Sequence, residues 1–169
     1  MPRGRRPKFS RQFYYHVYNR GNWKFPIFFQ TADYLFFLNK MDRLSSRQFC
    51  NIEVRAFCLM DNHYHLVLKQ RSPVSISKFI QRLSISYSMY LNIKYKHPGH
   101  TFQGRFHARP LRSQTELKRL LEYIKENPMK AGYVNHWEKY RWVDVGTDLR
   151  GDGPQLRKLA SFSFFSTIV

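Results

Sequence analysis

Acidic residues, cysteines and long apolar runs are all scarce in this chain. Its 169 residues include 11 Asp and Glu against 29 Lys and Arg, so the formal net charge is +18. The two cysteines, Cys50 and Cys58, are too few for a disulfide framework or a cysteine-based zinc site, and we expect inert packing residues in a reducing compartment. No run reaches the roughly 18 apolar residues of a membrane span, and no signal-peptide segment follows the basic N-terminus. We expect a cytoplasmic protein without a membrane partner.

The positive charge is spread along the whole chain, which favours a polyanionic partner. Aromatic residues make up 17% of the sequence, and many stand next to basic ones, as in Trp23-Lys24-Phe25 and Tyr90 to Lys96. This interleaving suits single-stranded nucleic acid, since basic side chains contact phosphates and rings stack on unpaired bases. The alternative is that the rings belong to the core, and we adopt that interpretation for Phe36, Phe37 and Phe79.

The length corresponds to one domain with a tail at each end. We divide the chain into a basic arm at residues 1–11, a domain at residues 12–145, and a tail at residues 146–169 to which no function is assigned. The basic residues of the arm are Arg3, Arg5, Arg6, Lys8 and Arg11. On a chain this cationic we favour phosphate contact over a plain solvated tail.

Hydrophobic periodicity and turn residues predict elements in the order βαββαβα. We expect strands at residues 12–19, 52–60, 63–69 and 105–111, and helices at residues 31–47, 75–95 and 113–132. The first six elements are those of the ferredoxin-like split-βαβ motif. The predicted fold class is therefore α+β, with an antiparallel sheet and helices on one face.

Helix ends are indicated by capping residues. Thr31 or Asp33 is expected to cap the first helix. Ser113 and Glu116 have the spacing of a capping box at the start of the third helix, which we expect to close at Pro128 and Gly132.

Two histidines separated by one residue, His63 and His65, begin the second arm of a predicted hairpin whose turn is Asp61-Asn62. Side chains two apart on a strand point the same way, so both imidazoles would project from one face like a pair of metal ligands. A buried strand gains little from two rings that each need a hydrogen bond or water. The alternative is a pair of partly exposed polar positions on an amphipathic strand, and this short motif alone leaves both open.

Tyr123 and Asn127 lie one helical turn apart on the third predicted helix. Both fall on the flank of its apolar stripe, which runs from Leu117 to Ile124. A side chain there can be held firmly and still reach a cleft at the edge of the sheet. Each residue also has an ordinary structural interpretation, Tyr123 as a packing ring and Asn127 as a helix-end residue.

Several ordered motifs resemble the single-tyrosine HUH transposases, particularly the REP-associated tyrosine transposases of bacteria. The resemblance covers about residues 12 to 142 and rests on Tyr15 to Gly21, on His63-Tyr64-His65 within MDNHYHLVL, on Thr101 to Phe106, and on Tyr123 to Pro128 with Ala131-Gly132. It implies a ferredoxin-like HUH nuclease domain that acts on single-stranded DNA with a divalent metal.

The resemblance also implies roles for individual residues. His63 and His65 look like metal ligands, Tyr123 like the nucleophile, and Asn127 like the third ligand, at a position where insertion-sequence relatives usually have glutamine. The expected product is a 5′-phosphotyrosine link with a free 3′-hydroxyl. Members of the family occur as dimers that share active sites or as monomers, so a homodimer is possible here.

The metal is a separate question from its ligands. Imidazoles are compatible with zinc, copper or nickel, whereas amide and phosphate oxygens suit magnesium or manganese. The resemblance favours Mg²⁺ or Mn²⁺, held partly by the substrate. Five further histidines can in principle complete a zinc site, but none repeats a strong ligand spacing, and we expect them to face solvent or phosphate: His16, His97, His100, His107 and His136.

Our first hypothesis is a transposase, associated with the nucleoid, that nicks and rejoins single-stranded DNA beside hairpin repeats. The arm together with Arg20, Arg105, Arg109 and Arg112 would hold the DNA backbone. The alternative is a non-catalytic nucleic-acid-binding regulator on the same fold, for which an intact Tyr123 and histidine pair would not be required. A third hypothesis, a histidine-ligated zinc hydrolase, predicts activity that survives Tyr123→Phe.

Overall fold

A computed structural model of the protein describes residues 9–96 and 99–146. The predicted phosphate contacts of Arg3, Arg5, Arg6 and Lys8 lie outside these residues, and so do residues 147–169 of the predicted tail.

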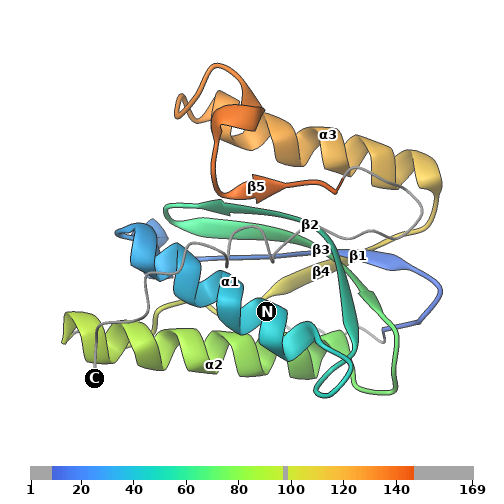
Figure 1. Cartoon of the computed structure of the whole chain (residues 1–169), viewed down its shortest axis with the longest axis horizontal. Coiled ribbons are helices and arrows are strands. Elements are labelled where there is room, and N and C mark those ends of the chain that lie inside the picture. The colour runs from blue at the N-terminus through green and yellow to red at the C-terminus, as the bar shows by residue number, and fades with distance from the viewer. Residues whose placement is uncertain (1–8, 97–98, 147–169) are drawn as a thin grey trace.

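A five-stranded antiparallel sheet with the strand order β4-β1-β3-β2-β5 forms the centre of the fold (Figure 1). Its strands are β1 (Tyr14–Arg20), β2 (Ile52–Met60), β3 (His63–Gln70), β4 (His107–Leu111) and β5 (Val143–Asp144). The helices are α1 (Thr31–Ser45), α2 (Ile76–Tyr95) and α3 (Gln114–Lys130), with two short 3-10 turns, η1 (Asn22–Lys24) and η2 (Trp137–Lys139).

The predicted α+β class and the element order are confirmed, with one strand added. β5 has only two residues, which is too short for an alternating pattern to appear in the sequence. It pairs with the outer edge of β2, where Phe57 lies opposite Asp144 and Cys58 opposite Val143.

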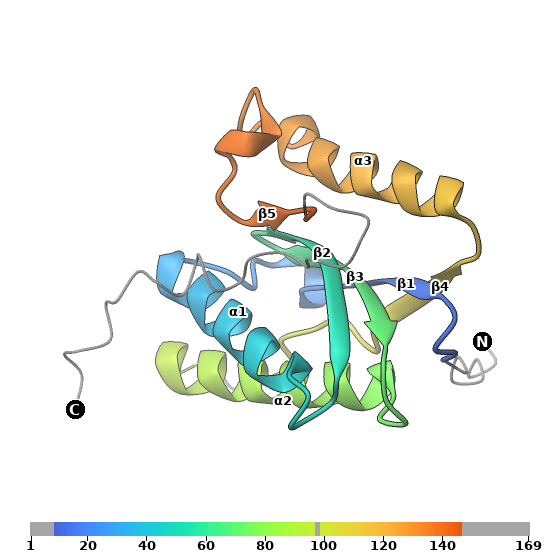
Figure 2. The same ribbon diagram turned by 45° about the vertical axis from the view of Figure 1, so that its right-hand side comes forward.

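Helices cover both faces of the sheet (Figures 1 and 2). α1 and α2 lie on one face, as predicted for the first six elements, and α3 lies on the other. The helices lie on both faces because each face of the sheet has its own apolar cluster. Phe37, Phe79 and Tyr87 belong to the cluster on the α1 and α2 side, while Leu121 and Ile124 of α3 belong to the other.

The central strand β3 contributes to both layers because its side chains alternate between the two faces. Tyr64, Leu66 and Leu68 pack in the cluster of α1 and α2, whereas Val67 packs in the cluster of α3. His63 and His65 alternate in step with Val67, so both histidines face the α3 side. Strand pairing with β1 and β2 fixes this register.

The N-terminus of α1 is built differently from the prediction. Gln30 is the N-cap residue, and Asp33 at the third helical position completes a capping box with it. The Asp33 carboxylate is fully buried and accepts hydrogen bonds from the backbone N–H of Phe29, at 2.9 Å, and of Gln30, at 3.1 Å. It also accepts hydrogen bonds from side chains of α2.

The start of α3 shows half of the predicted capping box. The Ser113 hydroxyl accepts a hydrogen bond from the Glu116 N–H at 3.1 Å, but the Glu116 carboxylate accepts from the N–H of Arg112 and not from that of Ser113. Pro128 lies within the last turn instead of ending the helix, which closes just before Gly132, a residue at φ 75°.

Both cysteines are free and buried, as predicted. Within residues 9–96 and 99–146, none of the helices is long and apolar enough to span a membrane.

Candidate active site

A cavity of about 810 Å³ lies where β1, β3 and the segment before β4 meet α3. Residues from all four regions line it: Tyr18, Asn19, Arg20 and Lys24, then Asn62, His63 and His65, then Gln103, Gly104, Arg105 and His107, and finally Tyr123. The fold thus brings together five of the predicted site residues, which are far apart in the sequence: Arg20, His63, His65, Arg105 and Tyr123.

The two histidines of β3 lie side by side with their ring centroids 5.0 Å apart and their planes nearly perpendicular. Nδ1 of His63 is 2.6 Å from Oδ1 of Asn62. An amide oxygen only accepts, so His63 carries its proton on Nδ1 and keeps a lone pair on Nε2.

Among the described residues, one ring nitrogen of His65 has a hydrogen-bond partner and the other has none. Its Nδ1 lies 2.9 Å from Nε2 of His16 on β1. Its Nε2 is buried and has no hydrogen-bond partner within the described residues. A buried ring nitrogen without a partner is costly, and a metal ion can satisfy it when the proton of the ring is on Nδ1.

The three imidazoles of this group are neutral at neutral pH. Burial lowers the pKa of His65 to about 3, assisted by repulsion from His16 and His63. Burial likewise lowers the pKa of His16 to about 4, with a smaller contribution from the charge of Arg109. Burial is also the main reason that the pKa of His63 is lowered. Neutral imidazole is the form that binds metals.

Tyr123 of α3 stands against His65, with ring centroids 5.6 Å apart and an interplanar angle of 82°. Its side chain is 41% exposed, so the ring is held beside the histidines while remaining accessible to a substrate in the cavity. The ammonium group of Lys130 lies 5.8 Å from the centroid of the Tyr123 ring.

Asn127 lies one turn further along α3, and it is not among the residues that line the cavity. Its Nδ2 donates a hydrogen bond to the backbone carbonyl of Tyr123 at 2.8 Å, which leaves its Oδ1 without a hydrogen bond to the described residues. The role of Asn127 as third ligand stays a prediction.

The residues present fit a divalent metal only when a further donor completes the set. His63 and His65 offer two neutral imidazole nitrogens on one strand face. No group of three or more His, Cys, Asp or Glu able to hold a metal exists in residues 9–96 and 99–146. The remaining donors are then an amide such as that of Asn127 or oxygens of the substrate.

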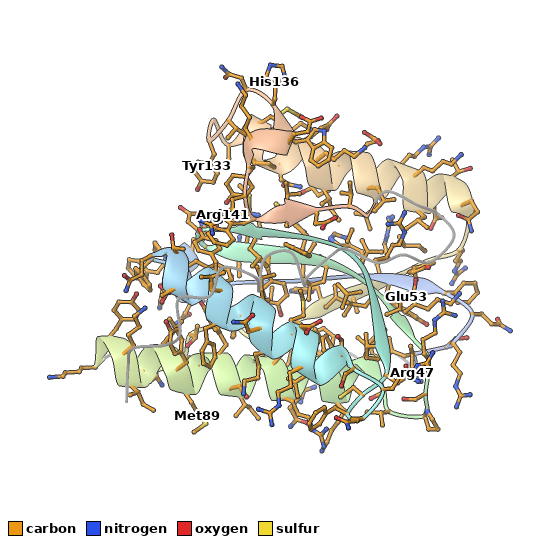
Figure 3. All side chains as sticks on the ribbon, in the orientation of Figure 1. Arg47, Glu53, Met89, Tyr133, His136 and Arg141 are labelled. Atoms are coloured by element: carbon orange, nitrogen blue, oxygen red, sulfur yellow. The ribbon has the colours of Figure 1, made fainter. Side chains whose placement is uncertain are left out.

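Among the described residues, the other histidines do not build a zinc site with this pair. His107 stacks on Tyr18 with centroids 5.1 Å apart, and His100 lines a different cavity. His136 lies just before η2, beyond α3 and away from the sheet (Figure 3). His97 lies outside the described residues.

The arginines predicted to hold DNA take two positions. Arg20 and Arg105 line the cavity, and the Arg20 guanidinium donates a hydrogen bond to the side chain of Gln103. Arg11, Arg109 and Arg112 are exposed but do not line it.

Sequence reasoning missed several residues of the site. The sequence predicts that His16 faces solvent or phosphate, and it does not mark Asn62 or Gln103 as site residues. His16 shares its strand face with Tyr18 and Arg20, but only the pairing of β1 with β3 brings it to His65, and that register is not readable from one strand.

Among solved structures, one similar in fold is described as the REP-associated tyrosine transposase bound to a REP hairpin. It has a TM-score of 0.70 and 17% identity, over 85% of this chain and 82% of that one. A second, a putative transposase from Deinococcus radiodurans R1, has a TM-score of 0.48 and 16% identity, over 75% of this chain and 97% of that one. No curated protein sequence matches the chain.

A sequence profile for the family described as "Transposase IS200 like" matches residues 9–127, a range that contains His16, both histidines of β3 and Tyr123. The matched range is more than half of the chain, and the chain therefore belongs to the IS200-like transposase family.

Proposed function

We propose that this transposase cleaves and rejoins single-stranded DNA through a covalent link between Tyr123 and a 5′-phosphate. The observation that carries the proposal is the contact between Tyr123 and His65 in a cavity lined by cationic side chains. Nε2 of this His65 has no hydrogen-bond partner among residues 9–96 and 99–146. A structural tyrosine would not need such a neighbour.

The cavity suits a phosphodiester. Arg20, Lys24 and Arg105 supply positive charge, and no acidic residue is among its lining residues in the described part of the chain. These cations can hold the phosphate next to the phenol, which converts a bimolecular attack into one within a complex. Bound there by His63, His65 and an oxygen donor such as Asn127, Mg²⁺ or Mn²⁺ would neutralise the charge of the phosphate oxygens.

In the cleavage step the Tyr123 phenol loses its proton and its oxygen attacks phosphorus. The bond from phosphorus to the 3′-oxygen breaks, and that oxygen leaves as a 3′-hydroxyl after taking up a proton. The ammonium of Lys130 lies 5.8 Å from the centroid of the Tyr123 ring and also forms an ion pair with Glu126 at 2.6 Å. Because the phosphoester is retained, a second 3′-hydroxyl can attack the link and join strands without an external energy source.

We further propose that the substrate is a single strand flanking a DNA hairpin. Support comes from the fold likeness to a transposase whose structure holds a REP hairpin, and from the net charge of +18. A duplex stem offers phosphates and shape, and the unpaired flank offers bases that can be read individually.

The test is covalent capture. The protein is incubated with Mg²⁺ or Mn²⁺ and a labelled oligonucleotide that carries a hairpin with single-stranded flanks, and the products are run on a denaturing gel. We expect a label that migrates with the protein, and its loss in Tyr123→Phe.

Tyr133→Phe is the matched control, because Tyr133 is 43% exposed, similar to Tyr123, but does not line the cavity. A pure binding protein gives no adduct with any hairpin. A hydrolase that uses the histidines alone continues to cut after Tyr123→Phe.

A further inference from the structure

A second cavity, of about 540 Å³, lies between η1, the start of α1 and the end of α2. Four aromatic side chains contribute to its walls: Trp23, Phe25, Phe29 and Tyr95. Polar groups stand among them, from Asn22, Asn92, His100 and Thr101.

The rings of this cavity are unusually exposed for their size. Trp23 is 81% exposed, Phe25 67% and Phe29 57%. Burying such rings is favourable, so a fixed cluster left open to water indicates a binding surface. The wall is held in place, because Phe29 packs on Tyr95 with centroids 4.8 Å apart and the Tyr95 hydroxyl donates to Asp33 at 2.7 Å.

A strained turn presents two of these rings. Trp23 has φ 53° and Lys24 φ 61°, in the left-handed region that side chains with a Cβ rarely adopt. The Asn62 amide donates to the Lys24 carbonyl at 3.2 Å and helps to fix the turn. As a result Lys24 lines the first cavity, while Trp23 and Phe25 line the second.

The two cavities share the same pair of chain segments. The N–H of Asn22 donates to the carbonyl of Thr101 at 3.0 Å, and that of Gln103 donates to the carbonyl of Arg20 at 3.0 Å. Arg20 and Gln103 line the first cavity, whereas Asn22 and Thr101 line the second. The two cavities therefore lie next to each other along these segments.

The composition of the second cavity identifies the occupant. No carboxylate is among its lining residues in the described part of the chain, which suits a polyanion. Flat aromatic walls with amide, imidazole and hydroxyl groups between them match a nucleobase, which stacks by its face and forms hydrogen bonds by its edge.

We propose that the second cavity binds an unpaired base of the DNA strand whose phosphate lies in the first cavity, by stacking on Trp23. This inference rests on the proposed function for the identity of the strand. The site would select DNA that is single-stranded next to the cleavage point, because a paired base cannot enter it.

The test is a thermodynamic cycle between a ring and a base. Affinity is measured by fluorescence anisotropy in the Tyr123→Phe background, so that no chemistry intervenes. The ligands are a hairpin oligonucleotide with single-stranded flanks and a series of copies, each with an abasic position in the flank. Trp23→Ala is expected to weaken binding of the intact oligonucleotide about 5- to 150-fold.

In the Tyr123→Phe protein, one abasic position should weaken binding by a similar factor. When Trp23→Ala is also present, the same abasic position should weaken binding little further. Phe49→Ala is the matched control, since Phe49 is also an exposed ring, 39% accessible, but lies on the loop after α1 and packs against Arg43. That change should leave affinity within about twofold, as for a surface position.

The proposal is overturned if Trp23→Ala and every abasic position act independently, or if Trp23→Ala leaves affinity unchanged. It is also overturned if Trp23→Ala dissociates a dimer in sedimentation without weakening DNA binding, which would make the surface an interface between copies. Because the cycle uses Tyr123→Phe, it can succeed when the covalent capture assay fails. The covalent capture assay can likewise succeed when the cycle fails.

Discussion

The Nε2 of His16 lies 2.9 Å from the Nδ1 of His65, and the other ring nitrogen of His65 has no partner in the described part of the chain. With both rings neutral, one proton lies between the two nitrogens. If it is on Nδ1 of His65, Nε2 keeps its lone pair for a metal. In that tautomer His16 on β1 would orient His65 as a metal ligand, as outer-shell partners of metal-bound histidines commonly do.

Replacing His16 tests whether it orients the ring of His65. His16→Phe keeps a ring on β1 but removes the acceptor for the His65 N–H. We expect Mn²⁺ affinity, measured by calorimetry on the free protein, to fall about 10- to 100-fold.

His16→Gln, which retains an acceptor, should restore part of the affinity, and His136→Phe, at an exposed position, should leave it unchanged. Unaltered Mn²⁺ binding in His16→Phe would show that His16 does not position His65.

A buried carboxylate joins α1 to α2. Asp33 accepts hydrogen bonds from Lys94 at 2.6 Å, Tyr95 at 2.7 Å and Tyr90 at 2.9 Å. Burial alone would raise the pKa of Asp33, but the bonds from Lys94, Tyr95, the Phe29 N–H and Tyr90 outweigh it and hold the pKa below its ordinary value of 3.8. Asp33→Ala leaves these donors unpaired and should lower the free energy of unfolding at pH 7 by about 3–5 kcal/mol.

The same carboxylate predicts a pH dependence. A pKa lowered by folding stabilises the protein at pH values above 3.8, and this stabilisation is lost as the pH falls through the pKa of the folded state. Urea unfolding from pH 7 to pH 3 should therefore show the difference between the unmodified protein and Asp33→Ala shrinking below about pH 4. Asp42→Asn, an exposed acid on α1, is the control, and a difference that stays constant with pH contradicts the assignment.

Gly21 precedes the strained turn that carries Trp23. A Cβ at Gly21 would lie 2.0 Å from the carbonyl oxygen of Phe25, a backbone atom that cannot move aside cheaply. Gly21→Ala should destabilise the protein by about 1–3 kcal/mol in urea unfolding and weaken binding of single-stranded DNA, since the turn must shift.

Gly104→Ala is the matched control for stability, because a Cβ there meets nothing within 4 Å. Its unfolding midpoint should change by less than the equivalent of about 0.5 kcal/mol. Equal destabilisation by the two substitutions would contradict the packing argument.

The elements of this fold were predictable because their signals are local. Helical periodicity placed α2 within one residue of its observed start, and Ser75 caps it as a hydroxyl at that position should. The alternation of side chains in β3 also predicted that His63 and His65 share one face. Helical periodicity predicted that Tyr123 lies on the flank of the apolar stripe of α3.

The parts that were not predictable depend on pairing between distant segments. His16 reaches His65 only through the register of β1 on β3. The left-handed turn at Trp23 has no sequence signal, because neither tryptophan nor lysine favours that conformation. The ligand role of Asn127 was predicted from the family resemblance alone. In the structure its amide nitrogen donates to the backbone carbonyl of Tyr123 in the same helix.

If Tyr123 is the nucleophile, it becomes joined to DNA, and peptide mapping of the covalent product identifies the modified residue. Trypsin cleaves after Arg119 and Lys125, so Tyr123 is released in the peptide 120–125, in which it is the one tyrosine. We predict that mass spectrometry finds the nucleotide on this peptide, with a 3′-hydroxyl on the other DNA fragment. A nucleotide attached to any other peptide, or cleavage without any modified peptide, would contradict the account.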